Sequence, residues 1–130
     1  MARWWPCLSW HSEVTAAEWG RRAERAAENY LIRRGLRTLE RNYRVRAGEI
    51  DLVMTHHDEL VFVEVRFRSR SYFGDGADSV DYRKQQRLIS AARHYLQHRG
   101  DERPCRFDVV SVGRTHYRLR FEWMRNAFTP

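Results

Sequence analysis

Three carboxylates lie within or beside the two most strand-like runs of the sequence, GEIDLVMTH and ELVFVEVRF. If a hairpin turns at residues 57–58, paired positions sum to 115, and Asp51 lies opposite Glu64. Because side chains alternate along each strand, Glu49 and Arg66 share the face of this pair. Opposed side chains on such a hairpin have Cβ atoms about 4.5–5.5 Å apart. The sequence therefore predicts a cluster of acidic groups on one sheet face.

Two explanations fit the opposed carboxylates. Carboxylates this close repel each other, and a buried charge without a partner loses hydration worth several kcal/mol. Mg²⁺ is typically held by one or two carboxylates together with water and substrate phosphate, so Asp51 and Glu64 are candidate ligands of Mg²⁺ or Mn²⁺. The alternative is a salt-bridge ladder on a solvated face, in which Glu49 bonds Arg66 and Asp51 bonds another arginine. The residues alone leave both explanations open.

The elements that must hold this hairpin follow from the hydrophobic pattern. Apolar residues recur at helical spacing over residues 15–34, and Gly35 is expected to cap that helix. A strand is expected over residues 36–46, and a second helix over residues 81–99. The hairpin face opposite the carboxylates is wholly apolar and is expected to be buried. It carries Ile50, Leu52, Met54, Val61, Val63, Val65 and Phe67.

Two further strands are expected over residues 105–113 and 117–124, the last of them exposed. The order is then helix, three strands, helix, two strands. A strand–helix–strand step favours a sheet covered by helices. The sequence therefore predicts an α/β fold with a mixed β-sheet flanked by helices.

The composition indicates which kinds of partner and which compartment suit the chain. Its 130 residues include 24 Lys and Arg against 17 Asp and Glu, a formal net charge of +7, which favours nucleic acid as a partner. Cys7 and Cys105 have no metal-ligand spacing and suit a reducing compartment. The aromatic N-terminus is too short to span a membrane. We expect a cytoplasmic protein without a membrane partner, with a loose tail at residues 1–14 and one domain at residues 15–130.

Several longer words of the sequence resemble the YraN family: GRRAERAAENYL, LERNYRVRAGEIDLV, LVFVEVRFRSR, YRKQQRLISAARHYL, CRFDVVSV and the terminal NAF. Asp51, followed after twelve residues by Glu64-Val65-Arg66, also resembles the PD-(D/E)xK nuclease signature. The family is predicted to share the restriction-endonuclease-like fold and is similar to archaeal Holliday-junction resolvases. The resemblance implies an Mg²⁺- or Mn²⁺-dependent endonuclease, a hydrolase of DNA rather than RNA. Because resolvase-like proteins are typically dimers, it also implies a homodimer.

The resemblance identifies candidate site residues in this sequence. Asp51 matches the metal-binding aspartate of the nuclease pattern, and Glu64 matches its second carboxylate. Glu24, on the first expected helix, matches an acidic residue of the family; it either points towards the strand carboxylates or lies in solvent. Glu49 belongs to the word GEID and is either a further metal ligand or the salt-bridge partner of Arg66.

Arg66 stands where the nuclease pattern has lysine. A lysine ammonium can lose a proton and help to activate water, whereas an arginine stays protonated. Arginine still holds a scissile phosphate and stabilises its developing charge. Lys84, the only lysine, lies one turn before Leu88 on the core-facing side of the second expected helix. It either leans towards the site in place of the missing lysine or reaches solvent at the helix start.

Basic residues continue beyond the hairpin. Arg66, Arg68 and Arg70 share one parity, which suits contacts along a phosphate backbone. Together with Lys84 they are the predicted nucleic-acid-binding residues. The alternative function is a nuclease-fold nucleic-acid-binding protein or adaptor without efficient catalysis. Asp108, in the word RFDVV, is interpreted as a structural residue bonded to an arginine.

Overall fold

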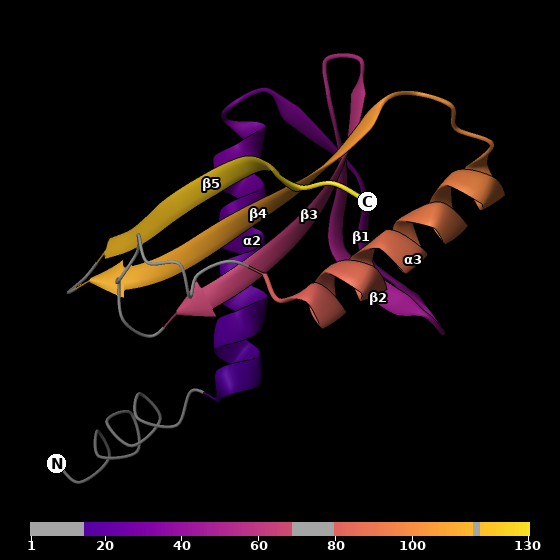
Figure 1. The fold of residues 1–130 in the computed structure, drawn as a ribbon. Coiled ribbons are helices and arrows are strands. Elements are labelled where there is room, and N and C mark those ends of the chain that lie inside the picture. The colour runs from indigo at the N-terminus through magenta and orange to yellow at the C-terminus, as the bar shows by residue number, and fades with distance from the viewer. Residues whose placement is uncertain (1–14, 69–79, 116–117) are drawn as a thin grey trace, which may run out of the picture.

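A computed structural model describes residues 15–68, 80–115 and 118–130 (Figure 1). The described residues form two helices and a five-stranded sheet, in the order α2 (Ala16–Ile32), β1 (Leu36–Val45), β2 (Gly48–His56), β3 (Glu59–Arg68), α3 (Tyr82–Arg99), β4 (Cys105–Thr115) and β5 (Arg118–Phe128). The predicted order of elements and the mixed α/β class are confirmed. The expected tail at residues 1–14, and Arg70, lie outside the described residues.

The sheet has the strand order β1-β2-β3-β4-β5. Neighbouring strands are antiparallel except for β3 and β4, which are parallel. Parallel neighbours need a long crossover, and α3 supplies it between these two strands. The predicted hairpin register is confirmed over the paired stretch, where Leu52 lies opposite Val63 and His56 lies opposite Glu59.

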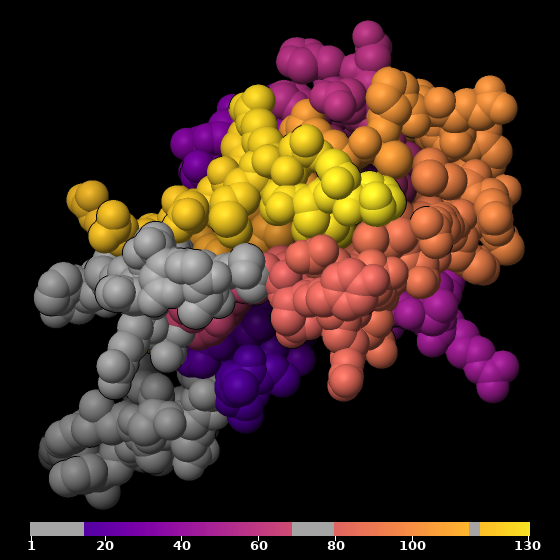
Figure 2. All heavy atoms as spheres, viewed as in Figure 1, coloured from indigo at the N-terminus to yellow at the C-terminus, as the bar shows by residue number. Residues whose placement is uncertain are grey.

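Each helix covers one face of the sheet (Figure 1). On one face α2 packs Ala27 and Leu31 against Leu52 and Val63. On the other face α3 packs Leu88 and Ala92 against Val53 and Phe62, which are completely buried. The end of β5 lies beside α3 on this second face, where Phe128 stacks on Phe107 (Figure 2). The carboxylate face of the hairpin is therefore covered by a helix and is not an open, solvated surface.

One expected core residue lies on the other side of the sheet. Ile50 was expected to share a face with Leu52, but it packs in the core beneath α3. The pairing of β1 with β2 skips Asp51 and its opposite residue Asn42, which has a left-handed φ of 50°. Simple alternation therefore fails at Asp51, because β1 is irregular there. The same irregularity places Asp51 at a break between two regular stretches of strand.

Local hydrogen bonds define the helix ends. Thr15 and Glu18 form a reciprocal capping box at the start of α2. Asp81 accepts a hydrogen bond from the backbone N–H of Lys84 at the start of α3, and Gly100 ends this helix with a left-handed φ of 59°. Gly35 was predicted to cap the first helix, but α2 ends at Ile32 with Arg33 as its cap. Gly35 instead lies in the turn before β1, with a φ of 98°.

Candidate active site

Asp51 lies where β2 and β3 stop pairing. The paired stretch ends at Leu52 and Val63, and beyond it the backbone N–H of Val65 donates to Oδ2 of Asp51 at 2.8 Å. Burial raises the pKa of Asp51 to about 8, and the negative charge of Glu64 is the second cause. The bond from Val65 opposes this rise. Asp51 is thus held firmly in an environment that disfavours its charge.

The ion pairs of the described residues do not include Asp51. Among residues 15–68, 80–115 and 118–130, no lysine or arginine forms an ion pair with Asp51. Glu49 is exposed and pairs with Arg44 on β1 at 3.4 Å between Nε and Oε2. Glu49 therefore has an arginine partner on β1, unlike Asp51.

Glu64 is the second buried carboxylate of the site, with 6% of its surface exposed. Lys84 reaches it from the first turn of α3, with Nζ at 3.0 Å from Oε1. About half of the lysine side chain is exposed (51%), so solvent screens part of this attraction. The structure thus places the only lysine of the sequence beside Glu64 rather than directing it away from the sheet.

Glu24 approaches the same carboxylates from α2 on the other side of the sheet. It is half-buried, and burial is the main cause that raises its pKa. The charge of Arg44 opposes the rise, and the charges of Glu64 and Glu49 add to it. Acidic groups from α2, β2 and β3 therefore act on one another electrostatically at the break in the hairpin.

Glu28 is a buried acidic residue that sequence reasoning missed. It accepts hydrogen bonds from Thr38 and Arg41 on β1, and the guanidinium of Arg41 lies 2.7 Å from its Oε2. The hydrogen bonds from these partners lower the pKa of Glu28 against the opposing effect of burial. Its position four residues after Glu24, on the same helix face, was the available signal. Glu28 ties α2 to β1 and is already neutralised, unlike Asp51.

The predicted arginines are only partly placed. Arg66 follows Glu64 by two positions on β3, so both residues start from the same strand face. Arg68 ends β3 and is half-buried, as Arg66 is. Arg70 lies outside the described residues. Of these arginines, Arg66 therefore lies on the same strand face as Glu64.

The donor set fits a hard divalent cation with few protein ligands. No group of three or more His, Cys, Asp or Glu side chains in the described part of the chain is arranged to hold a metal ion. Mg²⁺ needs only one or two carboxylates, because water and substrate phosphate complete its shell. Asp51 and Glu64 offer two such groups, and a cation would supply the positive charge that the ion pairs of the described residues do not give Asp51.

Comparison with known proteins assigns the chain to a family. The family model "Uncharacterised protein family UPF0102" matches residues 23–112. This chain belongs to the UPF0102 family. It is 48% identical over 117 residues to a UPF0102 protein of Nitrosococcus oceani, a match that covers 88% of this chain and 94% of the relative. The resemblance to YraN proteins is confirmed as membership of this family.

Other UPF0102 relatives match over similar lengths. A UPF0102 protein of Stutzerimonas stutzeri is 50% identical over 111 residues, covering 84% of this chain and 92% of the relative. One from Nitrosomonas europaea is 50% identical over 115 residues, covering 88% and 96%. In this UPF0102 protein, no helix within the described residues is long and apolar enough to cross a membrane.

Gly48 sets how closely α3 approaches the site in this UPF0102 protein. A methyl group on Gly48 would overlap the backbone carbonyl of Arg87. Arg87 lies one helical turn after Lys84, so the close contact at Gly48 also holds Lys84 near Glu64. The close approach of α3 therefore explains why residue 48, the first of the segment GEID, is a glycine.

We expect Gly48→Ala to lower the free energy of unfolding by about 1–3 kcal/mol, because backbone atoms must move to admit the methyl group. Chemical denaturation measures this change. Gly20→Ala is the matched control, because a Cβ at Gly20 meets nothing within 4 Å and alanine favours the helix interior by about 0.5–1 kcal/mol. Equal stability of Gly48→Ala and the parent protein would show that α3 does not rest on this glycine.

Asp108 has the structural role predicted for it. It is almost completely buried and accepts hydrogen bonds from Arg106 Nε at 3.0 Å, Trp123 Nε1 at 2.9 Å and the backbone N–H of Asn126 at 2.9 Å. Arg106 also pairs with Glu59 at 2.8 Å. This carboxylate is fully engaged in joining β4 to β5, and it differs from Asp51 in having a cation beside it.

Proposed function

We propose that this UPF0102 protein is a metal-dependent nuclease that hydrolyses phosphodiester bonds of DNA, with branched or junction DNA as its substrate. The observation that carries the proposal is the pair Asp51 and Glu64, two carboxylates of which the first is disfavoured in its charged form by burial and repulsion and forms no ion pair within the described residues. A divalent cation and a phosphate are the natural partners of such a pair.

Each site residue receives a role. Asp51 and Glu64 hold Mg²⁺ or Mn²⁺, with Glu49 or Glu24 assisting. When bound, such an ion lowers the pKa of water and polarises the phosphate. Arg66 donates hydrogen bonds to the scissile phosphate and stabilises the charge that develops on it.

Lys84 is a cation that contacts one of the proposed metal ligands directly. Its Nζ lies 3.0 Å from Glu64, so it neutralises that carboxylate before DNA binds. We infer that it also attracts the phosphate and takes over part of the role of the lysine that the nuclease pattern has at the position of Arg66.

The resemblance to restriction-endonuclease-like proteins and archaeal resolvases supports the same reading. It favours DNA over RNA and a homodimer that presents two sites to a junction. The formal net charge of +7 supports a polyanionic substrate. We also propose that the protein works in the cytoplasm, where its substrate DNA lies.

A panel of labelled nucleic acids tests the proposed activity. Four-way junctions, flaps, plain duplexes and single strands of DNA, with RNA counterparts, are incubated with Mg²⁺, Mn²⁺ or EDTA. We expect cleavage of DNA with either metal and none with EDTA. If every substrate is bound but none is cut with any metal, the protein is the non-catalytic binder. Arg66 favours this alternative, because an arginine stays protonated and cannot help to activate water as the lysine of the nuclease pattern can.

Binding itself is expected to depend steeply on salt. Each phosphate neutralised by an arginine or lysine lowers the slope of log affinity against log salt by about 0.9 on duplex DNA. We expect a slope of several units, independent of sequence, in anisotropy titrations with EDTA present. Lack of affinity for every DNA and RNA form at low salt would remove both the nuclease and the binder.

A further inference from the structure

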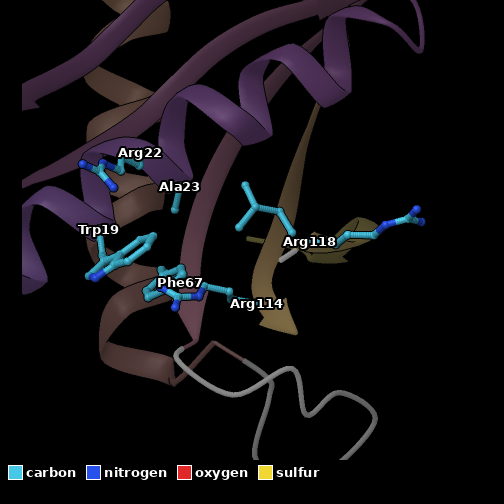
Figure 3. Close-up of a pocket in the computed structure, with 7 residues that line it drawn as sticks. Trp19, Arg22, Ala23, Phe67, Arg114 and Arg118 are labelled. Atoms are coloured by element: carbon cyan, nitrogen blue, oxygen red, sulfur yellow. The ribbon is translucent and has the colours of Figure 1, made fainter. Parts of the chain in front are cut away.

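A second site lies on the α2 face of the sheet and is built from four elements. A pocket of about 370 Å³ is lined by Trp19 and Arg22 from α2, Phe67 from β3, Arg114 from β4, and Arg118 and Leu119 from β5 (Figure 3). None of these residues is among the proposed metal ligands. Among the described residues that line it, no side chain is acidic. The pocket therefore combines aromatic surface with positive charge.

Its aromatic part is a flat platform. The rings of Trp19 and Phe67 stack with their centroids 5.4 Å apart and their planes 2° from parallel. Both residues are half-buried, so the platform is supported by the protein and still reaches solvent. The guanidinium of Arg114 lies over the Trp19 ring at 4.7 Å, and that of Arg22 lies over it at 5.2 Å.

These contacts indicate the chemistry of a ligand. A flat π system binds to an aromatic platform by stacking, and exposed arginines beside it pair with anionic groups. A nucleotide offers both parts, a flat base and a phosphate. An acidic peptide offers only the charge, and an apolar ligand offers only the surface. The cation–π contacts of the two arginines are weak at exposed positions and are replaced when a base takes the ring face and a phosphate takes the arginine.

The pocket lies on the α2 face of the sheet, whereas Glu64 lies on the α3 face, where it pairs with Lys84. Phe67 follows Glu64 by three positions on β3, a distance of about 10 Å along the strand. Trp19 precedes Glu24 by five positions on α2, about 7.5 Å along the helix. About 10 Å corresponds to roughly three stacked nucleotides of a DNA strand. The pocket and the carboxylates are therefore close along β3 but open on different faces of the sheet.

We propose that the Trp19–Phe67 pocket holds an unpaired nucleotide of the bound DNA, so that the protein selects DNA with unstacked bases. In a plain duplex the bases are stacked on their neighbours and are not available to the platform. A flap or a junction with frayed arms offers a free base. This inference rests on the proposed function, because it names which DNA the nuclease site receives.

The test measures binding in EDTA, so it does not depend on cleavage. A fluorescent duplex with a ten-thymidine flap and a blunt duplex of equal length are titrated with the full chain, the variants and the parent. We expect Trp19→Ala to weaken flap binding about tenfold, since stacking on one aromatic residue has roughly this effect, with little change for the blunt duplex. Trp19→Phe keeps an aromatic ring and is expected to bind the flap nearly as tightly as the parent.

Comparison of Arg114→Gln with Arg37→Gln distinguishes the loss of a pocket residue from the loss of positive charge in general. Arg37 is exposed on β1 and does not line the pocket, so both variants lose one positive charge. We expect Arg114→Gln alone to reduce the preference for the flap over the duplex. Thermal melting verifies that each variant is folded.

Three results would overturn the inference: no loss in Trp19→Ala, an equal loss on flap and duplex, or competition by a glutamate decapeptide as strong as that by ten thymidines. The last result would mean that the pocket takes acidic peptides. If only the pocket inference is wrong, metal-dependent cleavage of DNA is still observed. If only the proposed function is wrong, flap binding is still observed and cleavage is absent. The two failures are thus distinguishable.

Discussion

Asp51→Asn is expected to abolish DNA cleavage and at the same time to make the protein more stable in metal-free buffer. The loss of a metal ligand removes several kcal/mol of transition-state stabilisation, which corresponds to a rate reduction of about a thousandfold or more. The asparagine Oδ1 still accepts the hydrogen bond that Val65 donates to Asp51. DNA affinity is expected to hold or rise, because a carboxylate that repels phosphate is gone.

The gain in stability depends on pH. Burial and the charge of Glu64 raise the pKa of Asp51 from its ordinary 3.8 to about 8. The folded state therefore prefers the protonated form, and ionised Asp51 lowers stability progressively as pH rises from about 4 to about 8. The advantage of Asp51→Asn is expected to be small at pH 4 and on the order of a few kcal/mol at pH 9.

Denaturant unfolding of the parent and of Asp51→Asn in EDTA, at both ends of this pH range, measures the effect. In the parent, Mg²⁺ is expected to stabilise the fold, since it binds only the folded site, and this stabilisation is expected to disappear in the variant. A variant that is markedly less stable in EDTA, together with a parent that does not respond to Mg²⁺, would contradict a metal site and favour the non-catalytic binder.

Asp108→Asn is expected to have the opposite effect on stability. The Asp108 side chain is fully buried and shares its charge with Arg106, whose own side chain is only 10% exposed. Removing one partner of a buried ion pair costs about 3–5 kcal/mol, because the other charge remains in the interior. Trp123 and Asn126 donate to different oxygens of Asp108, so an asparagine amide also places its NH2 donor against one of these two N–H groups.

The same denaturation assay measures Asp108→Asn, and its loss of stability is expected to be independent of Mg²⁺. The two variants form a matched pair, since each changes one buried or half-buried aspartate to its neutral isostere. Asp51 has no cation beside it among the described residues, and Asp108 has one. Destabilisation of equal size in both variants would mean that Asp51 is also a structural ion-pair partner.

The positions of the main elements were predictable because they depend on local pattern. Alternating apolar residues and a turn at residues 57–58 specified the hairpin register that the structure shows. Helical spacing placed Lys84 one turn before Leu88, on the side of α3 that approaches the sheet. Asp51 and Glu64 were identified from the same pattern, since charges inside strand-like runs are unusual.

Other features depend on packing between distant elements and left little trace in the sequence. Ile50 changed sides because β1 is irregular at Asn42, which simple alternation cannot show. The need for Gly48 arises only when α3 approaches β2. The Trp19–Phe67 pocket joins four elements that are separated by up to about a hundred residues of chain. Such contacts follow from the tertiary fold rather than from spacing along one strand or helix.

The most direct measurement is the cleavage rate of a labelled four-way DNA junction as a function of Mg²⁺ concentration. The parent and Asp51→Asn are compared at protein concentrations that bind the same fraction of DNA. We expect the cleavage rate of the parent to rise with Mg²⁺, to saturate and to vanish in EDTA, and the rate of the variant to be at least about a thousandfold lower. Cleavage by Asp51→Asn at the parental rate, or no cleavage by the parent at any Mg²⁺ or Mn²⁺ concentration, would contradict the proposed function.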